Sequence, residues 1–202
     1  MFTSRVGITL RQFEQLQSRA HRSGKAESIA PAIRCEQVVI LGVDPSVRGT
    51  GFGIIQMQKR QPIALAHGTM RCPAKWERSR CLAHIARTLR EQIEKFHPTV
   101  CIVEGLFFAQ NLQTAIIMGE ARGASLAAAA EAGLEIFEIA PRKVKQAIVG
   151  YGAAQKLAVA KMVQRLLSLD EAPSADAADA LALALAYAQT ASRYGLDAPK
   201  RV

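Results

Sequence analysis

The stretch Val38-Val39-Ile40-Leu41-Gly42-Val43-Asp44 is a short run of apolar, mostly β-branched residues that ends on an acid. Such a run predicts a strand that is buried on both faces of a sheet. After a polar turn, Gly49-Thr50-Gly51 leads into a second apolar run at 52–55, and a third stretch follows at 63–71. Because these strands follow each other so closely, we expect antiparallel hairpins at the start of the sheet.

The rest of the chain alternates between helical and extended patterns. The predicted elements are, in chain order, a helix at 77–96, a strand at 99–103, a helix at 111–131, a strand at 134–139 and helices at 142–149, 153–167 and 175–189. The order β-β-β-α-β-α-β-α-α-α predicts an α/β fold with a five-stranded mixed sheet flanked by helices, in a single domain.

Charge and composition narrow the class of partner. The chain of 202 residues has a net charge of +9, which favours a polyanion such as nucleic acid, because clustered Lys and Arg release counterions from phosphate. The four cysteines show no CxxC pair and no zinc-like spacing with the histidines, so we expect reduced thiols in a cytoplasmic protein. No apolar run reaches the roughly 18 residues of a membrane span, and we expect no membrane partner.

Three segments of the chain differ in character. We expect an N-terminal extension at 1–37, a folded domain at 38–191 and a basic C-terminal tail at 192–202. A disordered arm or a wrongly assigned start is the favoured interpretation of the first segment. Its basic, serine-containing beginning also leaves a mitochondrial presequence open.

Four acids stand out against apolar surroundings. Asp44 and Glu104 each end a predicted buried strand, and such strand ends face the usual ligand crevice of an α/β sheet. Asp176 and Asp179 lie three residues apart, and therefore on one face, of a helix that is otherwise almost apolar. Carboxylates at the edge of an apolar core are costly unless they are compensated, and Mg²⁺ supplies that compensation.

Each acid has a simpler interpretation when it is taken alone. Asp44 fits a turn former or helix cap, and Glu104 fits an ordinary loop acid. Asp176 fits a favourable charge in the first turn of a helix, whereas Asp179 lies deeper in an apolar helix and is harder to explain in this way. The four together are therefore a stronger indication of a metal site than any one of them.

Four motifs resemble the RuvC-type Holliday-junction resolvases, which are bacterial nucleases of the RNase H-like superfamily. The resemblance covers about residues 38–190, in the order and near the spacing of the family. The motifs are VDPSVRGTGFG at 43–53, VEGLFFAQN at 103–111, KVKQAIVGYG at 143–152 with Gln155-Lys156 after it, and ADAADALA at 175–182.

The resemblance implies an RNase H-like fold and an endonuclease that resolves four-way DNA junctions with symmetric paired nicks. Asp44, Glu104, Asp176 and Asp179 would bind two Mg²⁺ ions, with Mn²⁺ as a substitute, and an activated water would attack the scissile phosphate in line. The implied partners are four-way junction DNA and a second copy of the chain in a homodimer. Whether a RuvA–RuvB branch-migration complex delivers the junction stays open.

The resemblance also assigns three DNA-binding residues. Phe107 matches the aromatic wedge of the family, which stacks on bases at the opened crossover, and Lys145 and Lys156 match basic residues that contact the DNA backbone. From the residues alone, Phe107 could instead belong to the core, and both lysines could be solvated helix residues. For Arg122 we favour a structural ion pair over a contact with DNA.

The sequence departs from the common family pattern in three places. Ser46 replaces a usual Gly, Gly105 replaces a usual Gln, and the segment at 1–37 is additional. Three other functions stay open: an RNase H-like nuclease for other nucleic acids, a branched-DNA binding protein without catalysis, and an actin-like ATPase. The intact acids oppose the second of these, and the short chain opposes the third.

A smooth ridge on the predicted helix at 111–131 bears on assembly. Ala115, Gly119 and Gly123 recur every four residues, and a second copy of the chain could pack closely on them. The alternative is that the ridge simply covers the sheet. A two-fold dimer would match the approximate symmetry of a four-way junction.

Overall fold

The computed structural model describes residues 38–59, 61–105, 112–192 and 199–202. The predicted extension at 1–37 and the predicted wedge Phe107 lie outside these ranges. None of the helices in the described part of the chain is long and apolar enough to cross a membrane.

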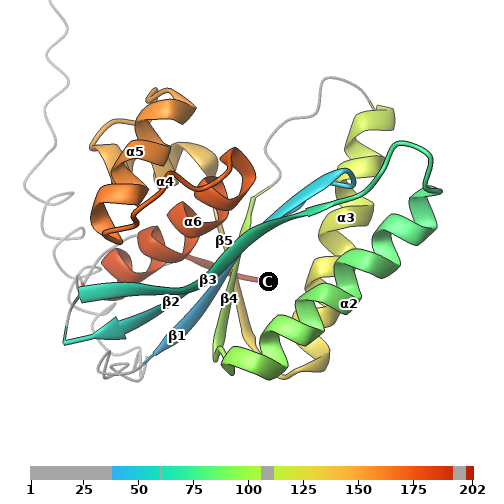
Figure 1. Cartoon of the computed structure of the whole chain (residues 1–202), viewed down its shortest axis with the longest axis horizontal. Coiled ribbons are helices and arrows are strands. Elements are labelled where there is room, and N and C mark those ends of the chain that lie inside the picture. Colours follow the sequence, from blue (N-terminus) through green and yellow to red (C-terminus); the bar gives the residue numbers. More distant parts are fainter. Residues whose placement is uncertain (1–37, 60, 106–111, 193–198) are drawn as a thin grey trace, which may run out of the picture. The chain divides into compact units, whose positions relative to one another are not determined.

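One mixed sheet forms the centre of the domain (Figure 1). Its strands are β1 (Val39–Asp44), β2 (Gly49–Gln58), β3 (Gln61–Arg71), β4 (Val100–Glu104), β5 (Glu135–Ile139) and β6 (Lys200–Arg201), in the spatial order β3-β2-β1-β4-β5-β6. The first three strands pair antiparallel, β1, β4 and β5 pair parallel, and β6 is antiparallel to β5. The predicted hairpins and α/β fold are confirmed.

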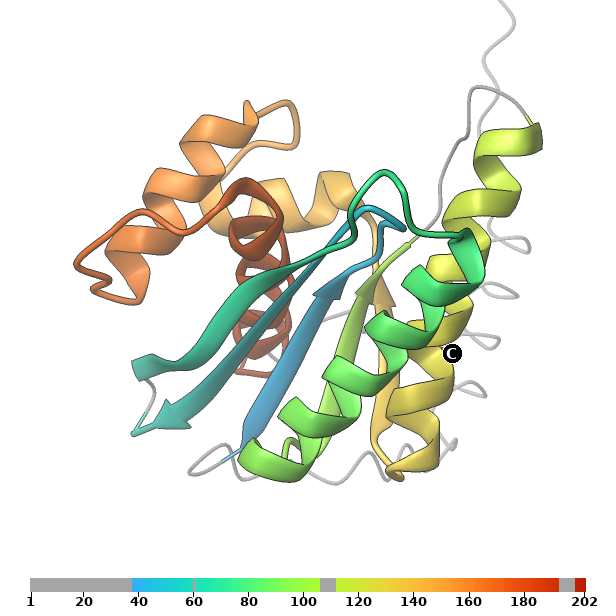
Figure 2. The same ribbon diagram turned by 45° about the vertical axis from the view of Figure 1, so that its right-hand side comes forward.

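Helices cover both faces of the sheet, as Figures 1 and 2 show. On one face lie α2 (Arg78–Phe96) and α3 (Leu112–Glu131), and on the other lie α4 (Pro141–Val149), α5 (Lys156–Leu166) and α6 (Ala175–Ser192). Strand β1 contributes to both cores: Ile40 packs with α4–α6, and Leu41 packs with α2 and α3. Both side chains are buried, which explains the continuous apolar run.

Helix α6 lies unusually close to the sheet because glycines form the surface beneath it. A Cβ atom added to Gly42 would collide with the backbone of Ala180, and one added to Gly51 would collide with the backbone of Asp176. At Gly53 the added atom would lie 2.7 Å from the side chain of Leu181. Every α6 residue from 177 to 188 except Asp179 is buried, so the apolar helix is fully used in packing.

The sheet has six strands rather than the five predicted. The additional strand β6 comprises Lys200 and Arg201, which lie in the predicted basic tail. Both residues are exposed and charged, so they carry no alternating apolar pattern that could have predicted a strand. Other differences are confined to the ends of elements, such as the start of α5 at Lys156 instead of 153.

The glycine beneath the first turn of α6 provides a test of this packing. We expect Gly51→Ala to lower the free energy of unfolding by about 1–3 kcal/mol or more, because the added methyl group must displace the helix backbone. Gly68→Ala is the matched control, since its methyl group would meet only the half-buried ring of Phe52. Urea denaturation of both variants measures the difference, and equal stabilities would contradict the close packing.

Candidate active site

The four predicted acids converge at one edge of the sheet. Strands β1 and β4 are parallel neighbours with Val43 opposite Val103, so Asp44 and Glu104 end adjacent strands side by side. Asp44 is also paired with Gly51, on which the first turn of α6 rests. The Asp176 carboxylate therefore lies over the start of β2, and Asp179 follows one helical turn later.

The carboxylates act on one another through a partly buried environment. The pKa of Asp44 is raised from 3.8 to about 7, mainly by burial and then by the negative charges of Glu104, Asp179 and Asp176, against the opposing effect of Lys156. Burial likewise raises the pKa of Glu104, followed by the charge of Asp179. These mutual effects place all four groups in a single electrostatic cluster that lacks sufficient positive charge.

Two lysines supply part of that positive charge. The Lys156 ammonium, at the first residue of α5, donates a hydrogen bond of 2.8 Å to Asp179 Oδ2, and this bond raises the pKa of Lys156. Lys145 on α4 lies close enough to Glu104 to lower the pKa of that acid. Both predicted DNA-binding lysines are thus at the acidic edge.

The donor set fits a hard divalent cation, because it consists of carboxylate oxygens whose negative charge is poorly compensated. In their present orientations, however, no three acidic, histidine or cysteine side chains of the described residues are arranged to hold a metal ion. Asp179 points instead to Lys156. A metal ion bound among these acids would compete with the lysine for Asp179.

The turn that carries Asp44 is fixed by its own hydrogen bonds. The hydroxyl of Thr50 accepts from the Ser46 N–H at 3.1 Å and donates to the carbonyl of the same residue. Ser46 is not one of the described non-glycine residues that have a positive φ. Serine in place of the usual glycine therefore causes no strain there, and the first departure from the family pattern leaves the turn intact.

Arg122, on α3, holds the end of β4 from the face of the sheet opposite to α6. Its guanidinium donates to the backbone carbonyl of Glu104 and, at 2.8 Å, to Glu138 Oε2 on β5. Glu138 also accepts from Lys200 at 3.0 Å. Arg122 is only 9% exposed, so the predicted structural ion pair is confirmed, and the residue additionally fixes the backbone of a predicted metal ligand.

Sequence reasoning missed several residues that support the site. Glu138 is an acid within a short apolar strand, a signal that could have indicated a buried partner. Thr69 and Ser174 share a hydroxyl–hydroxyl hydrogen bond of 2.7 Å that joins β3 to the segment before α6. No local pattern indicates this last contact, because 105 residues separate its two partners.

Comparisons with known proteins agree with this geometry. The family model described as crossover junction endodeoxyribonuclease RuvC matches residues 40–187. A RuvC protein of Akkermansia muciniphila is 46% identical over 148 residues, which cover 73% of this chain and 89% of that protein. One of Heliobacterium modesticaldum is 46% identical over 154 residues, which cover 76% and 95%.

Solved structures give the same result. Thermus thermophilus RuvC in complex with a Holliday junction substrate superposes with a TM-score of 0.74 at 32% identity, covering 82% of this chain and 99% of that one. The yeast mitochondrial Holliday junction resolvase Ydc2, at 12% identity and a TM-score of 0.57, shares the fold. By the extent of the family match and by these identities, the chain belongs to the RuvC family of crossover junction endodeoxyribonucleases.

Proposed function

We propose that this protein cuts four-way DNA junctions by metal-dependent hydrolysis of phosphodiester bonds. The observation that carries the proposal is the convergence of Asp44, Glu104, Asp176 and Asp179 at one edge of the sheet, within the region that matches the RuvC family. The Thermus thermophilus relative was solved with a Holliday junction substrate, which supports the same substrate class here.

The four acids would hold two Mg²⁺ ions, for which Mn²⁺ could substitute. When bound, the ions would compensate the carboxylates and the phosphate, and they would supply the chemistry that activates water and stabilises the leaving oxygen. The half-buried positions of the acids exclude bulk water from part of the site. Lys156, released from Asp179, would be free to turn its ammonium group toward the DNA backbone.

The DNA contacts extend from the acids to α4 and α5. Lys145 and Lys156 lie at the acidic edge and would bind phosphates near the cut. We retain Phe107 as the proposed wedge, a role that rests on its motif alone, and its stacking on a base would contribute roughly 1–3 kcal/mol. Delivery of the junction by a RuvA–RuvB complex and a cytoplasmic location rest on family membership alone.

The outer face of α3 supports a homodimer. Leu112 and Ile116 on this helix are 77% and 51% exposed, and Cβ atoms added to Gly119 or Gly123 would meet nothing within 4 Å. The helix uses other residues to pack inward: Ala121, Arg122, Ser125, Ala128 and Ala129. The ridge therefore does not serve to cover the sheet. A second copy of the chain packed on it would place two active sites in a two-fold arrangement, which would give the two symmetric cuts.

Loss of one acid should separate catalysis from binding. We expect the protein in Mg²⁺ to nick a mobile four-way junction symmetrically and to leave a matched linear duplex intact. Asp179→Asn should lower the cleavage rate by at least about a hundredfold, because it weakens a metal ligand.

Asp170→Asn is the matched control, since Asp170 is an exposed acid away from the cluster. Equal cutting of junction and linear duplex would replace the proposal with a general nuclease. Junction binding without cleavage in both Mg²⁺ and Mn²⁺ would replace it with a binding protein.

The raised pKa of Asp44 predicts how stability depends on pH without metal. A group whose pKa is raised on folding contributes fully to stability at pH values below its pKa in the unfolded chain, here 3.8. This contribution to stability is lost as the pH rises through the pKa of the folded protein, about 7. Asp44→Asn should therefore stabilise the protein in EDTA at pH 8, by on the order of 4 kcal/mol, with a smaller gain at pH 5.

Added Mg²⁺ should reverse the order at pH 8, because it stabilises the wild type more than the variant. Denaturant unfolding at both pH values, with EDTA or with Mg²⁺, measures these differences. A stability gain that is the same at both pH values would contradict the assigned burial of a charged Asp44.

The proposed dimer can be tested on α3. Ile116→Glu should convert the dimer to a monomer, because it places a charge on an exposed apolar position of the ridge. Leu157→Glu is the matched control, since Leu157 is 66% exposed on α5, away from the ridge. Light scattering after gel filtration gives both masses, and a wild type that is monomeric at micromolar concentration would refute the dimer.

A further inference from the structure

A basic segment connects β3 to α2 and has no role in the site described above. Its four basic residues are all exposed: Arg71, Lys75, Arg78 and Arg80. Arg78 pairs with Glu120 at 3.3 Å. Within the described ranges, Arg71 and Lys75 make no ion pair, so their charge is directed to solvent.

The segment lies at the same edge of the sheet as the acids. Asp44 is paired with Gly51, which is paired with Thr69, and Arg71 follows two residues further along β3. From the usual spacing of strands and residues, the backbone of Arg71 is roughly 12 Å from that of Asp44. Lys145 and Lys156 belong to helices on the other face of the sheet (Figure 2), so positive charge flanks the acids on both sides.

The segment is held in a fixed arrangement. The Arg48 guanidinium, next to the Asp44 turn, donates to the carbonyls of Pro73 at 2.8 Å and Trp76 at 3.0 Å. The Arg80 guanidinium stacks over the Trp76 ring, with its carbon 4.3 Å from the ring centre. A charged surface that is ordered before binding loses less entropy when a ligand docks.

The dipole of α2 does not favour these charges. Arg78 and Arg80 lie in the first turn of the helix, which contains no acid. Cations are unfavourable at this end of a helix, because they oppose the helix dipole. An anionic partner would turn this unfavourable placement into a favourable one.

We propose that Arg71, Lys75 and Arg80 bind the phosphate backbone of one duplex arm of the junction, on the α2 side of the acids. The inference rests on the proposed function, since it assumes a DNA substrate whose cut phosphate lies at the acids. Lys145 and Lys156 bind the backbone on the opposite side. The two basic surfaces together fix the direction of the strand that crosses the acidic edge, without reading its sequence.

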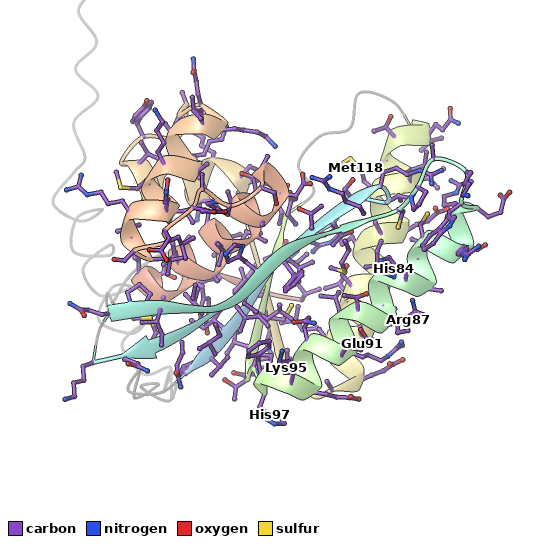
Figure 3. The ribbon with its side chains drawn as sticks, in the orientation of Figure 1. His84, Arg87, Glu91, Lys95, His97 and Met118 are labelled. Carbon is purple, nitrogen blue, oxygen red and sulfur yellow. The ribbon has the colours of Figure 1, made fainter. Side chains whose placement is uncertain are left out.

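The test compares two double variants that each remove two positive charges. Arg71→Gln/Lys75→Gln removes charge from the segment. The control, Lys59→Gln/Lys95→Gln, removes two positive charges from exposed positions at the β2–β3 turn and in the last turn of α2. Figure 3 shows Lys95 at the far end of α2, beside His97. All proteins carry Asp179→Asn to prevent cutting, and fluorescence anisotropy gives the Kd for a labelled junction as a function of salt.

We expect Arg71→Gln/Lys75→Gln to raise the Kd roughly tenfold at about 0.1 M salt. The slope of log Kd against log salt should become shallower by roughly two, because about one counterion is released per phosphate contact. The control pair should change the Kd less than about twofold. Lys75→Gln alone, in an exposed loop where misfolding is no concern, should change the slope by roughly one.

Equal Kd values and slopes for the two double variants would overturn this inference alone. Failure of the parent protein to bind the junction at any salt concentration would overturn the proposed function, and this inference with it.

Discussion

The close contact between the backbone of α6 and the glycines of β1 and β2 is the constraint on which the site depends. Gly42 and Gly51 leave no room for a side chain beneath the helix. The alanine-rich sequence of α6 meets that surface with equally small side chains. Only at this short distance do two acids on a helix reach two acids at strand ends, so the packing that stabilises the fold also assembles the charge cluster.

The cluster is assembled at a cost in stability. Burial and mutual repulsion raise the pKa of both Asp44 and Glu104, which means that the folded protein disfavours their charged forms. Lys156 offsets part of this cost through its contact with Asp179. The same lysine is largely exposed, so it stabilises the metal-free site from the solvent side and would compete with a bound cation for Asp179.

The fold and the convergence of the four acids could be predicted from sequence because their signals are local. An apolar run that ends on Asp44 and a three-residue spacing between Asp176 and Asp179 each require only a short window of the chain. The supporting contacts could not be predicted, because they join distant segments. The sequence indicates that Arg122 is structural, yet its partner Glu138 is known only from the folded sheet. Strand β6 is defined by its pairing with β5, since its residues have no apolar pattern.

Helix α3 connects the acids to the proposed dimer interface. Its inner face carries Arg122, which fixes the carbonyl of Glu104, and its outer face exposes Leu112 and Ile116. The two faces belong to one helix of 20 residues. In a two-fold dimer packed on the outer face, this helix would set the separation between the two sets of acids. A rigid helix that both packs on its partner and holds the end of β4 would therefore fix the spacing of the paired cuts by geometry rather than by recognition of sequence.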